Sequence, residues 1–81
     1  METNIPTPDQ LVDASGLTCP LPILRAKKAL SQMQSGEILK VITTDDHAAG
    51  DFQAFCAQSG NELLAQKQLS NNVTEHYLKR R

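Results

Sequence analysis

The chain has 81 residues, of which 40% are hydrophobic and 4% aromatic, and its formal net charge at pH 7 is −1. This length predicts one small domain, and the apolar fraction is large enough for a core, which argues against disorder. The near-neutral charge and the scarcity of aromatic side chains argue against a protein that binds nucleic acid or a membrane surface.

The N-terminal residues and the two cysteines bear on location. Residues 1–8 are polar and contain two prolines, which predicts a flexible tail ahead of a single domain over residues 9–81. No apolar run approaches the roughly 20 residues of a membrane span, and the start lacks the pattern of a signal peptide. We expect a cytoplasmic protein in which Cys19 and Cys56 are free thiols.

The first half of the chain predicts a strand followed by a helix. Residues 10–14 form a short apolar strand, which the Ser15-Gly16 pair ends. Gly36 is expected to stop the helix that follows, as its C′ residue. Between residues 20 and 34, apolar side chains recur at helical spacing and form one stripe, namely Ile23, Ala26, Leu30 and Met33.

The second half predicts a strand, a helix and a hairpin. Residues 37–44 form the clearest strand. The next helix begins near His47, or near Phe52 with Asp51 as its N-cap, and it ends at Gly60. Two further strands, over residues 62–69 and 73–79, are joined by a tight turn rich in asparagine.

This order of elements, βαβαββ, defines the fold class that we expect. Two helices packed on one face of a four-stranded mixed sheet form the natural two-layer α/β sandwich, an α+β arrangement, for so short a chain. The first strand–helix–strand unit should be a right-handed crossover with parallel strands, and the final hairpin should be antiparallel.

Cys19 lies between the first predicted strand and the first predicted helix, in the run Gly16-Leu17-Thr18-Cys19-Pro20-Leu21-Pro22. A thiol at a helix N-terminus meets unpaired backbone N–H groups and the positive end of the helix dipole, which favours the nucleophilic thiolate. Pro20 and Pro22 suit the first helical turn and keep the helix from starting before the cysteine. We therefore expect Cys19 at the N-cap or just before it, with an exposed sulfur.

Three other residues are expected to support this thiol. Gly16 permits the turn between strand and helix. Leu21 and Ile23 are candidates to offer backbone N–H groups to the sulfur.

The run resembles the Gly-Leu-x-Cys-Pro-x-Pro pattern of the TusA/SirA family of small sulfur-carrier proteins. The likeness extends from about residue 11 to residue 80, with Asp13-Ala14 before the run and Gly36-Glu37 after the helix. Asp46 and Gln53 depart from the pattern, since family members often have proline near those positions. The resemblance implies two helices on a four-stranded mixed sheet, the same fold that the order of elements predicts.

The resemblance also implies a sulfurtransferase that carries a sulfur atom as a persulfide on Cys19. The sulfur would come from a cysteine desulfurase or a rhodanese-like protein and pass to an acceptor protein. No cofactor is implied, because the sulfur travels covalently, and a monomer would suffice. Similar proteins are associated with transfer-RNA thiolation, sulfur oxidation and molybdenum cofactor supply, and these three pathways stay open.

Basic side chains follow the run on the predicted helix. Arg25 and Lys28 are candidates for stabilising the persulfide anion or for docking an acidic patch of a partner. A solvated helix face explains the same two side chains equally well. Lys27 is expected to be an ordinary surface residue.

The second cysteine and the two histidines are expected to have no chemical role. Cys56 shares an apolar face with Phe52 and Phe55 and should pack as a small hydrophobe. His47 and His76 are expected to be solvated. No spacing of cysteine and histidine is typical of zinc, so no metal site is expected.

Two other classes of function make distinct predictions. A regulatory or adaptor module without chemistry would keep its partners and its cellular role after Cys19→Ser. A thiol redox protein would pair Cys19 with Cys56, and Cys56→Ala would abolish that disulfide.

Overall fold

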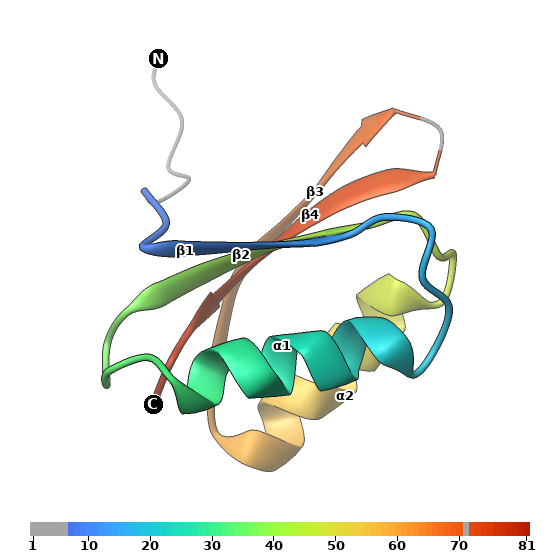
Figure 1. Cartoon of the computed structure of the whole chain (residues 1–81). Coiled ribbons are helices and arrows are strands. Elements are labelled where there is room, and N and C mark those ends of the chain that lie inside the picture. Colours follow the sequence, from blue (N-terminus) through green and yellow to red (C-terminus); the bar gives the residue numbers. More distant parts are fainter. Residues whose placement is uncertain (1–6, 71) are drawn as a thin grey trace.

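The element order is that expected from the sequence. The computed structural model describes residues 7–70 and 72–81, so most of the predicted tail and Asn71 of the predicted turn lie outside the described residues. Figure 1 shows the path of the chain through four strands and two helices. In chain order these are β1 (Gln10–Ala14), α1 (Leu21–Ser31), β2 (Ile38–Thr43), α2 (Ala48–Ser59), β3 (Glu62–Ser70) and β4 (Val73–Lys79).

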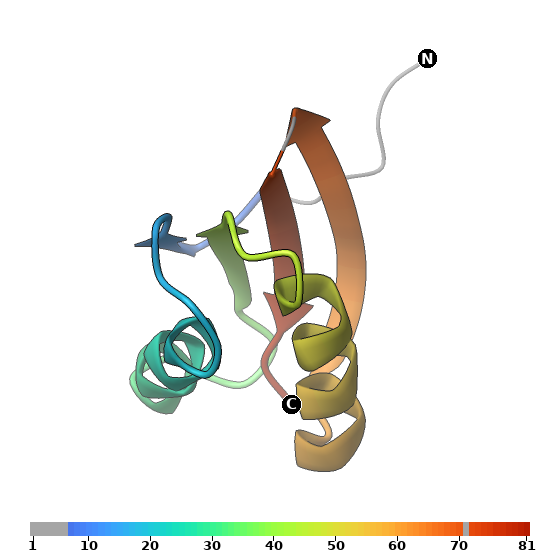
Figure 2. The same ribbon diagram turned by 90° about the vertical axis from the view of Figure 1, so that its right-hand side faces the viewer.

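The strands form one mixed sheet in the order β1-β2-β4-β3. β1 pairs with β2 in parallel, with Val12 opposite Val41, and β4 pairs antiparallel with both β2 and β3. Figure 2 shows that both helices lie on the same face of this sheet. The predicted two-layer fold is therefore confirmed, with a parallel first unit and an antiparallel hairpin.

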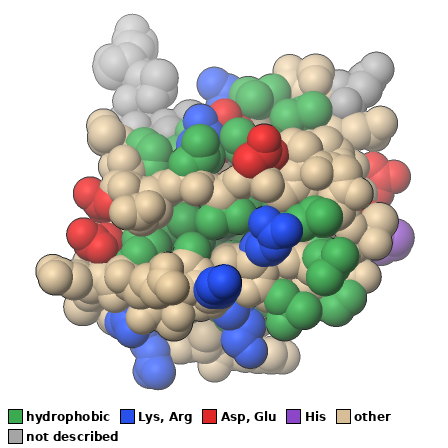
Figure 3. Space-filling view, in the orientation of Figure 1, with side chains coloured by type: hydrophobic (Ala, Val, Ile, Leu, Met, Phe, Trp, Pro, Cys, Tyr) green, Lys and Arg blue, Asp and Glu red, His purple; other side chains and the backbone are tan. Residues whose placement is uncertain are grey.

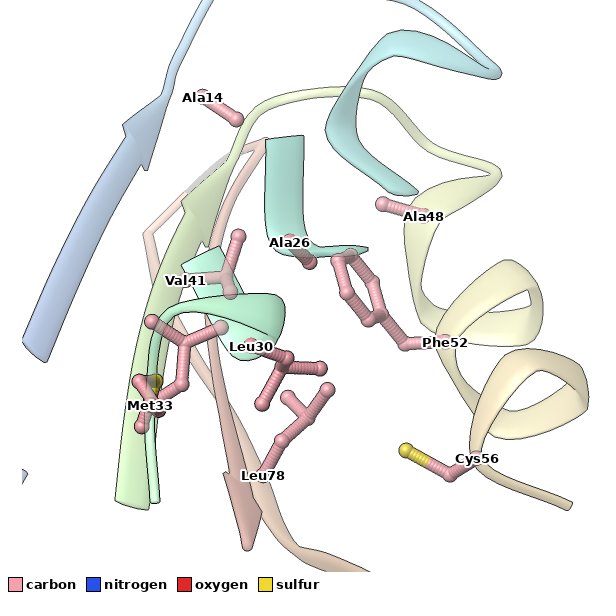
Figure 4. Packing of buried hydrophobic residues seen from close by; sticks show 10 residues of the cluster. Ala14, Ala26, Leu30, Met33, Val41, Ala48, Phe52, Cys56 and Leu78 are labelled. Atoms are coloured by element: carbon pink, nitrogen blue, oxygen red, sulfur yellow. The ribbon is translucent and has the colours of Figure 1, made fainter. Parts of the chain in front are cut away.

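The core lies between the helices and the inner strands. Phe52 of α2 is fully buried and projects toward α1, where it meets Ala26 (Figure 4). The sheet contributes the fully buried side chains of Leu39, Val41 and Leu78. Cys56 lies one turn after Phe52 on the same face of α2 and is buried, as predicted for a packing residue.

The first helix ends earlier than the sequence predicts. α1 stops at Ser31 with Gln32 as its C-cap, three residues before the predicted end at residue 34. Met33 is buried, and so continues the apolar stripe, but its N–H donates to the carbonyl of Leu30 in a tighter turn. Gly36 has φ of +88° and donates its N–H to the carbonyl of Arg80, so it turns the chain into β2 rather than capping α1.

The two possible starts of the second helix are now resolved. α2 begins at Ala48 with His47 as its N-cap residue, so Asp51 lies in the first turn and is not the cap. Gly60 ends the helix as predicted, with φ of +86° in the left-handed region.

His76 is buried, contrary to the expectation that it is solvated. It lies on β4 with no exposed surface, and its ring stacks on Phe52 with a centroid distance of 4.6 Å. Its Nε2 is 2.7 Å from the Thr43 hydroxyl, and its Nδ1 is 3.1 Å from the Gln66 amide nitrogen. Burial lowers the pKa of His76 to about 4, which keeps the ring neutral at pH 7.

This buried ring predicts a loss of stability in mild acid. Between pH 6.5 and pH 4 the unfolded chain binds a proton that the folded chain does not, so the free energy of unfolding falls as the pH falls. The pKa difference corresponds to at most about 3 kcal/mol. Urea unfolding across this range would measure the loss, and His76→Phe should flatten it, whereas an equal slope in both proteins would contradict it.

Candidate functional site

Cys19 is exposed in the loop between β1 and α1, as the sequence predicts. The Cys19–Pro20 peptide bond is cis, and Pro20 is the N-cap residue of α1. Pro22 takes the second helical position and is buried, so it anchors the first turn of the helix. The thiol therefore stands just before the N-terminus of α1, with its sulfur open to solvent.

Two hydrogen bonds fix the thiol loop to the neighbouring loop between β2 and α2. Because β1 and β2 are parallel, both loops leave the same end of the sheet (Figure 1). The N–H of Gly16 donates to the Thr44 hydroxyl at 2.8 Å, and the N–H of Cys19 donates to Asp45 Oδ2 at 2.9 Å. Gly16 has φ of +80°, a conformation that side-chain-bearing residues rarely adopt, which explains the glycine at this turn.

Carboxylates, rather than free N–H groups, dominate the surroundings of the sulfur. The Asp51 carboxylate raises the pKa of Cys19, with smaller contributions from desolvation of the thiol and from the charge of Asp45. The N–H of Leu21 donates to the carbonyl of Thr18 at 2.8 Å and so is not available to the sulfur. The expectations of a lowered pKa and of a Leu21 N–H bond to the sulfur are therefore wrong.

Sequence reasoning did not place Asp45 and Asp51 at the site. Asp45 lies two residues after the end of β2, and the parallel pairing of β1 with β2 brings the ends of these strands together. The sequence predicted that pairing, so the position of Asp45 shortly after the strand could have indicated that it lies near Cys19. Asp51 depends on where α2 begins, and the sequence left this start open between two positions.

Arg25 and Lys28 lie together on α1, on the rim of a surface groove between this helix and β1. Leu11, Val12 and Ala29 also line the groove. Figure 3 shows basic and hydrophobic side chains next to one another on this face of the molecule. Lys27 points elsewhere and lines a second groove, between the two helices, together with Arg80 and Arg81.

The remaining titratable candidates lie away from Cys19 or are unreactive. Cys56 is buried, and burial raises its pKa to about 11. His47 is exposed at the start of α2, as predicted, with its Nδ1 3.4 Å from Asp45 Oδ1. Across residues 7–70 and 72–81, no three side chains of His, Cys, Asp or Glu are placed to hold a metal ion. In the same part of the chain, no helix is long and apolar enough to cross a membrane.

The fold and the exposed thiol define a small domain that presents one cysteine to other molecules. The chain belongs to the family described as sulfurtransferase TusA, whose model matches residues 10–80. A role in sulfur transfer follows from this membership, and the resemblance seen in the sequence is confirmed.

Individual relatives and a solved structure agree with this family. The chain is 60% identical over 60 residues to the sulfur carrier protein TusA of Allochromatium vinosum. The aligned residues make up 74% of this chain and 79% of that protein. Identity to the protein of the same name from Pseudomonas putida F1 is 40% over 62 residues, 76% of this chain and 78% of the relative. The crystal structure of a SirA-like protein from Desulfitobacterium hafniense superposes with a TM-score of 0.77 at 28% identity, over 86% of this chain and 95% of that one.

Proposed function

We propose that this protein accepts sulfane sulfur as a persulfide on Cys19 and passes it to an acceptor protein. The observation that carries the proposal is the exposed thiol at the junction of β1 and α1, in a chain of the TusA family. Cys56 is no competitor for this role, because it is buried and out of reach of a partner's sulfur.

The chemistry consists of two exchanges at sulfur with no net oxidation. In loading, the Cys19 thiolate attacks the outer sulfur of a donor persulfide; a new S–S bond forms, the donor S–S bond breaks, and the donor cysteine leaves as a thiolate. In discharge, a thiolate of the acceptor attacks the outer sulfur on Cys19, and Cys19 leaves as a thiolate. Each step conserves electrons, so no external oxidant, reductant or cofactor is needed.

The geometry of the loop suits both exchanges. Attack at a persulfide proceeds along the S–S axis and needs an approach that neighbouring atoms do not block. The exposure of Cys19 leaves that approach open, while the Asp45 hydrogen bond holds its backbone in place. A fixed loop lowers the entropy lost when a partner aligns its own sulfur with Cys19.

The partners implied are one donor and one acceptor, both proteins. A cysteine desulfurase or a rhodanese-like protein supplies the sulfur, and transfer-RNA thiolation is the first pathway to test for its use. Arg25 and Lys28 fit a docking role for an acidic patch, because they flank a groove on the helix that begins beside Cys19. Long-range attraction of this kind would weaken as salt increases.

Intact-mass spectrometry tests the proposal directly. The protein is incubated with a cysteine desulfurase and cysteine, and we expect a gain of one sulfur atom that a reductant removes. Peptide mapping should place this sulfur on Cys19. If the desulfurase loads nothing, a rhodanese-like protein with thiosulfate is the second donor, and failure with both donors would overturn the proposal.

A further inference from the structure

β1 is an edge strand, and its outer side lies next to the first helix. The sheet has the order β1-β2-β4-β3, and within residues 7–70 and 72–81 no strand pairs with the outer edge of β1. Figures 1 and 2 show α1 running alongside β1 at this edge. Because backbone groups alternate in direction along a strand, about half of those in β1 point outward, where an added strand could bind them.

The two edges of the sheet differ in regularity. β1 pairs with β2 through five consecutive residues without a shift in register. β3, at the other edge, has two shifts in its register with β4, and its exposed Lys67 adds a charge. Register shifts and lysines on an edge strand are features that keep further strands from adding to a sheet. β1 has neither, so it is the edge that is better suited to an extended segment.

The groove beside this edge is apolar at its base and basic on its helical side. Val12 and Ala29 are half-buried and pack against the core, while Leu11 on the strand is 58% exposed. Arg25 and Lys28 are three residues apart and so share one face of α1. In the part of the chain that the structure describes, neither of these two side chains forms an ion pair. Both charges are therefore available to carboxylates of a partner.

The charge distribution favours an acidic partner for this groove. α1 carries three basic side chains and no acidic one, although the formal net charge of the whole chain is −1. Asp13 also lines the groove, but its carboxylate accepts the N–H of Ser15 at 3.0 Å. A second copy of the chain is disfavoured as the occupant, because antiparallel pairing of two β1 strands about a two-fold axis would place the two basic helices side by side.

We propose that the groove between β1 and α1 binds an extended acidic segment of a partner protein, which adds to the sheet as a strand on β1. Every second side chain of such a strand would face α1, at intervals of about 6–7 Å. Side chains three residues apart on a helix are separated by roughly 5–6 Å, so two carboxylates with one residue between them match Arg25 and Lys28. That the partner is a sulfur donor or acceptor rests on the proposed function.

Fluorescence anisotropy with a labelled, end-capped peptide in which glutamate alternates with valine tests the proposal on the isolated protein. Lys28→Glu should weaken binding roughly tenfold, because it replaces an attraction with a repulsion, and Arg25→Glu should act in the same way. Lys27→Glu makes the same change of charge on the same helix, but Lys27 lines the other groove, so its affinity should stay within about twofold of wild type. Equal affinities of Lys27→Glu and Lys28→Glu, or no binding by the wild type, would overturn the proposal.

Two modified peptides distinguish strand addition from docking through side chains alone. N-methylation removes a backbone N–H and leaves the side chain unchanged, and it is placed on the valines of one peptide and on the glutamates of the other. Because N–H groups alternate in direction along a strand, only one of these two sets can donate to β1. One peptide should therefore bind more than about tenfold more weakly than the other. Equal affinities of the two peptides would contradict an added strand.

Sedimentation velocity and sulfur loading complete the test. A wild-type dimer that the peptide dissociates would place a second copy in the groove and overturn the proposal. Cys19→Ser should bind the peptide as the wild type does, because Cys19 is not among the residues that line the groove. Peptide binding without sulfur loading in the wild type would count against the proposed function alone, and sulfur loading without peptide binding would count against the role of the groove alone.

Discussion

Cys19→Ser is expected to abolish sulfur loading and transfer completely. A serine hydroxyl stays protonated near neutral pH and is a weak nucleophile without an adjacent base, so it cannot take sulfur from a persulfide. The loop should keep its shape, because the backbone N–H of Cys19 still donates to Asp45 when the side chain is changed. Transfer of radiolabelled sulfur from cysteine, through a cysteine desulfurase, to the protein measures the loss, and circular dichroism checks the fold.

Cys56→Ala is the matched control, and it also separates the alternative functions. Cys56 is buried in the core with a raised pKa, so its replacement should lower stability but leave sulfur transfer intact. Loss of transfer in Cys56→Ala at a temperature where the variant is folded would favour a thiol redox protein. Retained partner binding together with an unchanged cellular role in Cys19→Ser would favour an adaptor module instead.

Phe52→Ala is expected to lower the free energy of unfolding by about 3–5 kcal/mol. Phe52 is fully buried, lies edge-on to Phe55 at a centroid distance of 6.5 Å, and covers the ring of His76. Its removal leaves a cavity between the two layers and uncovers a polar ring in the core. Since small domains have only about 5–15 kcal/mol in total, urea unfolding should show a large part of the stability lost.

Two other substitutions on the same helix serve as comparisons for this loss of stability. Phe52→Leu retains part of the side-chain volume and should cost less than Phe52→Ala. Gln58→Ala changes an exposed position and should stay within about 0.5 kcal/mol of wild type. A cost for Phe52→Ala that is no larger than the cost for Gln58→Ala would contradict the placement of Phe52 in the core.

The sequence predicted the elements well where local signals were strong. β1 and β4 match their predicted bounds, because each run contains apolar residues and has a turn at one end. Gly60 was identified as a helix end, since the left-handed conformation there suits glycine. The end of α1 was misplaced because Met33 continues the apolar stripe after the helix has changed to a tighter turn, and periodicity alone does not distinguish these cases.

The position of Cys19 was predictable, but its electrostatic setting was not. Cys19 and Pro22 indicate a strand–loop–helix junction, and the residues that carry this signal lie close together in the sequence. The groups that act on the sulfur, Asp45 and Asp51, are separated from it by more than 25 positions and arrive through the sheet topology. His76 was misjudged for the same reason, because its partners Thr43, Phe52 and Gln66 come from three other elements.

The two hydrogen bonds that fix the thiol loop determine which residues of the loop can change in sequence. Their donors are backbone N–H groups of the loop, and their acceptors, Thr44 and Asp45, belong to the other loop. The side chains of Thr18, Leu21 and Leu24 are exposed and take no part in either bond. Substitutions at these exposed positions would therefore leave both bonds intact, so the side chains around the sulfur can change while the loop stays in place.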